Sequence, residues 1–294
     1  MMRFGLRAHD FGKLPLTQLA DTLSTYAPAC IQLALAKALS DTPSFPGALS
    51  PGYARRLGET FSKKAIDIAV LGCYFNPIHP DPEAREAGLK RFEEHLRFVR
   101  DMGCAVVGTE TGSCNADCSY HPDTDSPTAF DSLIRSLERL VRTAERFGAI
   151  VGIEAVAYQH TLSSIPKLVE ALRRIDSPNL QVIYDPVNLL PLEGLPEPDG
   201  TVLPVPSVEV QRNFFRHALD QFGDRIVAVH LKDFRYTHGK KLGDLPALTG
   251  SLDTQGLLHL LALRKPFVDI LLENSDPATA RITLATLQRM SDAP

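Results

Sequence analysis

Four side chains that commonly bind metal ions stand at the ends of short apolar runs in the second half of the sequence: Glu154, Asp185, His230 and Glu273. Each one alone has an ordinary explanation, such as a solvated carboxylate, an aspartate that starts a turn before a proline, or a buried histidine with one hydrogen bond. Brought together, three carboxylates and an imidazole would repel one another or stay unpaired, and a cation removes that cost. The set therefore predicts a site for one divalent metal ion.

The ligand set also indicates the metal and the chemistry. Oxygen donors predominate, which favours Mn2+ and also admits Mg2+, Co2+ or Zn2+. A divalent ion that binds a carbonyl oxygen and the neighbouring hydroxyl of a substrate stabilises the enediolate formed when a proton is removed. Glu154 and Glu273 lie on different predicted strands, so they are the candidate catalytic residues, one removing a proton and the other returning it. Epimerisation, aldose–ketose isomerisation and dehydration all remain open.

Eight strands are needed to place these residues at one level. Short runs rich in Val, Ile, Leu and Ala recur at 3–8, 30–35, 66–75, 104–110, 150–156, 180–185, 226–233 and 267–274. Amphipathic stretches with helical spacing lie at 82–103, 126–148, 161–176, 208–223 and 276–290. This alternation predicts an α/β fold, a (β/α)8 TIM barrel with a single domain over residues 1–294, whose catalytic side is the C-terminal end of the strands.

An open, doubly wound sheet is the competing fold. It would have a glycine-rich phosphate loop after the first strand. The chain instead reads His9-Asp10-Phe11-Gly12-Lys13 at that place, so the barrel is favoured.

Further polar residues stand at the same ends of the predicted strands. His9 follows the first strand, where it either contacts a sugar hydroxyl or lies at the surface. Arg7 is expected to pair with Asp269 or Glu273 from the last strand. Glu110 ends the fourth strand. We expect it either to face the cleft or to cap a loop, and the sequence favours neither.

The later strands supply more candidates for substrate binding. Lys232 and Arg235 follow the seventh strand and could bind an anionic substrate group, although exposed basic residues near loops are common. His160 follows the fifth strand and could line the mouth of the barrel. Asn188 follows the sixth strand, three residues after Asp185, and its amide could hydrogen-bond a sugar hydroxyl.

The segments GIEAV, VIYDPVN, VHLKD and LLEN, which contain the four candidate ligands, resemble the xylose-isomerase-like superfamily of TIM barrels, within its sugar phosphate isomerase/epimerase group. The likeness covers nearly the whole chain. The order Glu, Asp, His, Glu on strands five to eight is similar to that of the ketose 3-epimerases and of inosose dehydratase. Two positions depart from the pattern. Asn188 stands where many members have a histidine, and Tyr236 stands where the epimerases have an arginine.

The resemblance implies a metal-dependent isomerase or epimerase of a sugar, sugar phosphate or polyol derivative. An inosose-dehydratase-like lyase acting through the same site is one alternative, and a non-catalytic sugar-binding barrel is another. A DNA phosphodiesterase of the endonuclease IV type is disfavoured, because that branch needs a trinuclear zinc site with several more histidines.

The whole sequence of 294 residues is consistent with an enzyme of small molecules. Its net charge of -4 argues against a nucleic-acid partner, and neither a membrane-spanning run nor a signal peptide is expected. Five cysteines, an odd number, indicate reduced thiols and a cytoplasmic location. Cys114, Cys118 and His121 could hold zinc, but free cysteines are favoured. The long loop 186–207 predicts a substrate cover or a contact in a homo-oligomer.

Overall fold

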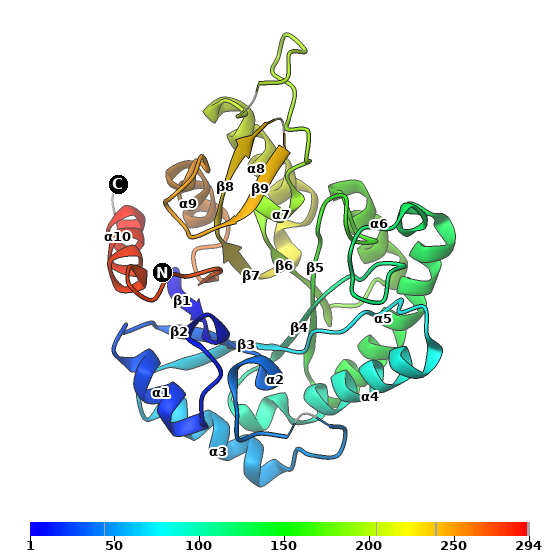
Figure 1. Cartoon of the computed structure of the whole chain (residues 1–294), viewed down its shortest axis with the longest axis vertical. Coiled ribbons are helices and arrows are strands. Elements are labelled where there is room, and N and C mark those ends of the chain that lie inside the picture. Colours follow the sequence, from blue (N-terminus) through cyan, green and yellow to red (C-terminus); the bar gives the residue numbers. More distant parts are fainter. Residues whose placement is uncertain (44, 204, 239, 293–294) are drawn as a thin grey trace.

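The chain folds into a closed barrel of eight parallel strands with helices around it (Figure 1). The computed structural model describes residues 1–43, 45–203, 205–238 and 240–292. Around the barrel the strands follow one another in chain order, and the last strand pairs with the first. This arrangement confirms the TIM-barrel fold and excludes the open sheet.

All eight predicted strands form, and most are shorter than the apolar runs that predicted them. They are β1 (Arg3–Arg7), β2 (Cys30–Leu33), β3 (Asp67–Gly72), β4 (Val106–Glu110), β5 (Ile150–Glu154), β6 (Leu180–Tyr184), β7 (Ile226–Leu231) and β10 (Asp269–Leu272). Each strand faces the barrel interior on one side and the helices on the other. Both sides are buried along most of the strands, which explains the nearly continuous apolar runs.

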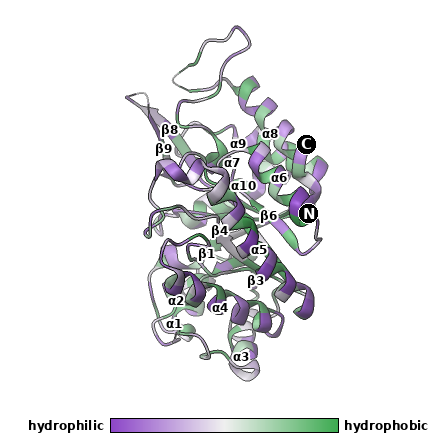
Figure 2. Cartoon of the chain, turned by 90° about the vertical axis from the view of Figure 1, so that its right-hand side faces the viewer, coloured by the Kyte–Doolittle hydropathy of each residue, from purple (hydrophilic) through white to green (hydrophobic). Residues whose placement is uncertain are grey.

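The helices surround this barrel and carry both hydrophilic and hydrophobic residues (Figure 2). They are α1 (Leu16–Ser24), α2 (Leu35–Ala38), α3 (Pro51–Ser62), α4 (Pro82–Phe98), α5 (Pro127–Phe147), α6 (Ile165–Ile175), α7 (Pro186–Leu189), α8 (Val208–Phe222), α9 (Thr254–Arg264) and α10 (Ala280–Asp292). The five predicted amphipathic stretches correspond to α4, α5, α6, α8 and α10. Among the described residues, no helix is both long and apolar enough to cross a membrane.

Helix α5 shows how the local sequence sets the bounds of an element. The hydroxyl of Ser126 accepts a hydrogen bond from the backbone N–H of Ala129, and Pro127 occupies the first turn, where its missing N–H has no cost. Gly148 ends the helix in the left-handed conformation with φ 62°. The helix therefore begins and ends within one residue of its predicted bounds.

Side chains fill the interior of the barrel. Ile183 from β6 extends across it and meets β4 and β5 at Gly108 and Gly152. A Cβ atom at Gly108 would lie 2.6 Å from the Cδ1 atom of Ile183, and one at Gly152 would lie 3.1 Å from it. These glycines make room for the isoleucine, so the barrel is a packed core with its functional groups at one end.

A two-stranded antiparallel hairpin, β8 (Asp233–Thr237) and β9 (Lys240–Leu245), follows β7 and was not predicted. The ammonium group of Lys241 on β9 donates hydrogen bonds to the carbonyl oxygens of Val187, at 2.7 Å, and Leu190. The hairpin is therefore fastened to the segment directly after β6. The predicted loop 186–207 begins with α7 and projects from the barrel beside the hairpin (Figure 1); its residue 204 lies outside the described residues.

Candidate metal centre and active site

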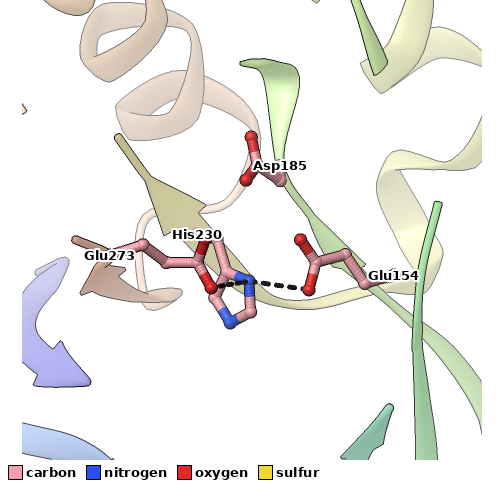
Figure 3. Close-up of side chains that lie close together, drawn as sticks. All are labelled: Glu154, Asp185, His230 and Glu273. Carbon is pink, nitrogen blue, oxygen red and sulfur yellow. Dashed lines mark ion pairs between the residues drawn. The ribbon is translucent and has the colours of Figure 1, made fainter. Parts of the chain in front are cut away.

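The four predicted metal ligands lie together at the C-terminal end of the barrel (Figure 3). Glu154 ends β5, Asp185 follows β6, His230 lies near the end of β7, and Glu273 follows β10. One ligand atom of each residue lies within 4.8 Å of those of the other three, and all four side chains are buried. In Figure 3 the two glutamates approach the imidazole from opposite sides.

The imidazole of His230 is in contact with both glutamates. Its Nδ1 atom lies 3.0 Å from Oε2 of Glu154 and 3.3 Å from Oε1 of Glu273. Burial opposes protonation of the imidazole, but the two carboxylates outweigh burial and raise the pKa of His230 to about 9. Without a metal, a proton on His230 thus balances part of the carboxylate charge. A cation bound at Nδ1 would replace that proton.

The other ring nitrogen of His230 is held by a residue that the sequence analysis missed. Nε2 donates a hydrogen bond to Oε1 of Gln32, at 2.5 Å, and the Gln32 amide donates to the hydroxyl of Tyr74. Because the second contact fixes the orientation of the amide, Nε2 carries the N–H and Nδ1 faces the carboxylates. The signal in the sequence was a single glutamine in the otherwise apolar run 30–35.

Two buried ligand atoms, Nδ1 of His230 and Oδ2 of Asp185, have no hydrogen-bond partner among the described residues. Their charged neighbours are near enough for an ionic contact but are not aligned for a hydrogen bond. Oδ1 of Asp185 accepts the backbone N–H of Asn188 at 2.9 Å as the cap of α7, so it is Oδ2 that remains for the centre. Burial raises the pKa of Asp185. Unpartnered donors in a mainly oxygen-containing cluster fit a divalent cation.

Two basic side chains lie against Glu273. Nη1 of Arg7 is 2.9 Å from Oε1 and Nζ of Lys232 is 3.0 Å from Oε2. Burial opposes the charge of Glu273, but His230, Lys232 and Arg7 hold its pKa well below the usual range. Lys232 also lies 3.1 Å from Oδ2 of Asp185. This buried lysine therefore contacts two of the carboxylates that would bind the metal ion. Of the two partners proposed for Arg7, the structure selects Glu273.

A polar cavity of about 270 Å³ has Glu273, one of the four ligands, in its lining. Five of the predicted substrate contacts line it: Arg7, Glu110, His160, Asn188 and Lys232. The amide of Asn188 donates to Oε1 of Glu154 at 2.6 Å. Nε2 of His160 lies 3.8 Å from Oε2 of Glu110, and burial lowers the pKa of His160 to about 4, so its imidazole is neutral near pH 7. Lys37 from α2 and Asp244 from β9 also line the cavity and were not predicted.

His9 and Arg235 lie outside this lining. His9 stands edge-on to the ring of Tyr74 with 6.0 Å between the ring centroids, and burial lowers its pKa to about 3. Arg235 is exposed on β8 and donates to the carbonyl oxygen of Thr249. The sequence did not reveal the hairpin that carries Arg235 outside the cavity.

The cysteine and histidine residues after β4 do not form a metal cluster in the described part of the chain, where the four-residue set is the group with ligand geometry. Cys114 and Cys118 are free thiols. Nδ1 of His121 accepts the backbone N–H of Asp123. Cys118 instead lines the polar cavity.

A closed (β/α)8 barrel with a buried cluster of carboxylates and histidine at its C-terminal strand ends defines a class of TIM-barrel proteins with a candidate metal site. Within that class, residues 29–289 match the family described as xylose isomerase-like TIM barrel. The chain belongs to this family.

Solved structures with the same fold include several proteins that act on sugars. A 3-keto-D-glucoside 4-epimerase from E. coli aligns with a TM-score of 0.69 at 16% identity, over 98% of this chain and 100% of that chain. A D-tagatose 3-epimerase-like protein aligns with a TM-score of 0.70 at 15% identity, over 99% and 98%. The IOLI protein with a bound zinc atom aligns with a TM-score of 0.65 at 15% identity, over 99% and 95%. A search of curated protein sequences gives no match.

Proposed function

We propose that this protein is a divalent-metal-dependent isomerase or epimerase that moves a proton next to a carbonyl group of a sugar, sugar phosphate or polyol derivative. The observation that carries the proposal is the buried set of three carboxylates and an imidazole, whose ligand atoms lie within 4.8 Å of one another. Two of those atoms have no hydrogen-bond partner among the described residues. The structural likeness to sugar epimerases adds support.

Glu154, Asp185, His230 and Glu273 would hold the ion. Their mainly oxygen donors favour Mn2+ and admit Mg2+, Co2+ or Zn2+, and zinc is bound in the related IOLI structure. When bound, the ion supplies a positive charge that stabilises the negative charge formed on the substrate as the proton leaves. The polar cavity of about 270 Å³ is slightly smaller than the usual range for drug-sized ligands, and so suits a monosaccharide.

The two glutamates would move the proton. They stand on opposite sides of the imidazole (Figure 3), so each can reach one face of a substrate bound between them. Their surroundings differ. Both oxygens of Glu273 contact a cation, Arg7 or Lys232, whereas Glu154 contacts the neutral amide of Asn188 and the imidazole. Glu154 therefore has neither a lysine nor an arginine in ionic contact with it among the described residues.

The other residues in the lining would bind and orient the substrate. Asn188 holds Glu154 and presents amide groups to the cavity, and the neutral His160 can exchange hydrogen bonds with hydroxyl groups. Glu110 faces the same cavity, and burial raises its pKa. Arg7 and Lys232 fix the position of Glu273. His9 and Arg235 stay candidates only for contacts made by a larger substrate.

A screen in D2O tests the proposal. The Mn2+-, Mg2+- and Co2+-loaded protein is incubated with ketoses, their phosphates and inososes, and NMR follows solvent deuterium at the carbon next to the carbonyl. We expect exchange with at least one substrate and its loss after chelation. Loss of water from an inosose would identify the lyase alternative. Tight sugar binding with neither exchange nor turnover would contradict the proposal and favour a sugar-binding barrel.

A further inference from the structure

A second cavity, here called the side cavity, has a volume of about 200 Å³ and lies next to the polar cavity. It is bounded by α2, the end of β3, one face of α4, and Pro43, Phe45, Ala48 and Leu49 from the chain after α2. Tyr74 and Lys37 line both cavities, and the ammonium group of Lys37 lies 4.0 Å from the centroid of the Tyr74 ring. This pair of residues therefore forms the boundary between the two spaces.

The walls of the side cavity are mainly apolar. Ala34, Leu35, Ala48 and Leu49 contribute aliphatic surface, and Tyr74 contributes aromatic surface. The hydroxyl of Tyr74 is directed to Gln32, the residue that holds the imidazole of the metal site. The hydroxyl of Tyr74 is thus hydrogen-bonded to Gln32 on the side of the metal centre, and its ring forms part of the apolar wall of the side cavity.

The polar side chains that α4 brings to the side cavity are already engaged with the protein backbone. Arg91 donates to the carbonyl oxygen of Tyr74 at 2.8 Å. Glu94 accepts the backbone N–H groups of Gly47 and Leu49 at 2.9 and 3.1 Å. A second sugar ring would bring several hydroxyl groups into this space and leave them poorly paired, which is unfavourable. An apolar group has no such requirement.

His95 is the histidine in the lining of the side cavity, and its Nδ1 atom is hydrogen-bonded to the carbonyl oxygen of Arg91 at 2.8 Å. Burial lowers the pKa of His95 to about 4, so the imidazole is neutral near pH 7. A neutral imidazole, an arginine engaged by a carbonyl and the Glu94 carboxylate do not make a phosphate site, and the ammonium group of Lys37 lies over the ring of Tyr74. The chemistry favours an uncharged ligand.

The volume sets the size of that ligand. A dry apolar cavity of roughly 150 Å³ is sufficient to bind benzene. The side cavity, at about 200 Å³, therefore accommodates one six-membered aromatic ring with little to spare. Phe45, whose side chain is 64% exposed, lies at the lining and offers a further aromatic surface to such a ring.

We infer that the side cavity binds an aryl substituent of the substrate, so that the preferred substrate class is an aryl-substituted carbohydrate whose sugar oxygens lie at the metal centre. This inference rests on the proposed function for the position of the sugar, but the cavity itself does not depend on a metal. On entry the ring displaces the Lys37 side chain from the face of Tyr74, at the boundary of the two cavities, and is buried against the aliphatic walls.

Two glycosides test the inference. Isothermal titration of the Mn2+-loaded protein compares phenyl β-D-glucopyranoside with methyl β-D-glucopyranoside, which share the sugar and differ in the substituent. Burial of one aromatic ring predicts that the phenyl glycoside binds about 10-fold more tightly or better. Equal affinity for the two glycosides in the unaltered protein would overturn the inference.

A matched pair of variants locates the effect. Ala48→Trp fills the side cavity from its half-buried rim and should reduce the preference for the phenyl glycoside to less than about 2-fold. Ala262→Trp makes the same change on the exposed surface of α9 and should leave the preference unchanged. A preference that survives in the folded Ala48→Trp protein would place the ring elsewhere and contradict the inference.

Phenol as a probe separates this inference from the proposed function. It should bind the metal-free protein, with NMR contacts to the methyl groups of Leu35 and Leu49. Displacement of phenol by inorganic phosphate would show an anion site and overturn the inference. Phenol binding in a protein that takes up no Mn2+ would support the side cavity while contradicting the proposed function. Mn2+ uptake and exchange on simple ketoses without any preference for phenyl would contradict the inference alone.

Discussion

Replacement of Gln32 by leucine should weaken metal binding without removing any ligand. Oε1 of Gln32 accepts the N–H of His230 Nε2 at 2.5 Å inside the barrel, and both side chains are buried. A buried donor left without an acceptor costs about 1–3 kcal/mol, which corresponds to about 5- to 150-fold in a dissociation constant. Loss of the partner of a metal-bound histidine typically weakens metal binding by about 10- to 100-fold. We expect a change in this range.

The assay is a titration of the metal-stripped protein with Mn2+, followed by calorimetry or by the EPR signal of free Mn2+. Gln32→Glu keeps an acceptor for the imidazole and should bind Mn2+ more tightly than Gln32→Leu. Gln181→Leu is a matched control, because Gln181 lies on β6 and donates only to the carbonyl oxygen of Pro178. Its dissociation constant should equal that of the unaltered protein.

A second measurement reads the imidazole directly. Nitrogen NMR of His230 in the metal-free protein, at a pH above the imidazole pKa of about 9, should show Nε2 protonated, because Gln32 accepts its N–H and holds that tautomer. The Gln32→Leu protein should show a mixture of states. If Gln32→Leu folds with an unchanged melting temperature and binds Mn2+ within 2-fold of the unaltered protein, the reasoning about His230 is refuted.

The remaining predictions concern catalysis, pH and the fold. Glu154→Gln and Glu273→Gln, each still metal-loaded, should lower kcat by about 100-fold or more; substrate exchange in D2O at the unaltered rate would show that they are not the bases. His95 has a folded pKa of about 4, below its unfolded value of 6.5, so its contribution to stability is present above pH 6.5 and is lost as the pH falls toward 4. His9 and His160 also have lowered pKa values, so urea unfolding between pH 7 and 4 should show a larger total loss, of which His95→Asn removes roughly 3 kcal/mol. An unchanged loss in that variant would exclude a contribution from His95. Gly5→Ala should destabilise the fold by about 1–3 kcal/mol, because the added Cβ would overlap the backbone of Cys30 on β2. Gly52→Ala is the control, because open space surrounds Gly52 and the change should not destabilise the fold. Equal melting temperatures for the two variants would contradict this packing.

The barrel could be predicted because its signals are local. Each strand is an apolar run, and helices such as α5 have a cap, a proline and a terminal glycine in the expected places. Two kinds of element lacked such signals. The segment of α9, TQGLLHLLALR, is apolar on several faces and shows no clear helical stripe. The hairpin β8–β9 is short, and β9 is largely polar, so neither strand resembles a buried strand of the barrel.

The ligand set of the site could be predicted for the same reason, since each ligand ends an apolar run. Its partners could not. Gln32 and His230 are separated by 198 positions in the sequence, and only the closure of the barrel brings them into contact. Arg235 lies five residues from His230, but β8 carries it outward. Beyond the end of a strand, closeness in sequence to a ligand therefore did not predict which residues line the cavity.

The most direct test of the central claim is the metal content of the purified protein after incubation with Mn2+ and removal of the free ion. Elemental analysis should find about one ion per chain, and the Glu154→Ala/Glu273→Ala double variant should retain none. A Gln181→Leu sample prepared in parallel should match the unaltered protein, which controls for ions bound at other sites. Absence of metal from the unaltered protein, or equal content in the double variant, would contradict a metal centre at these residues.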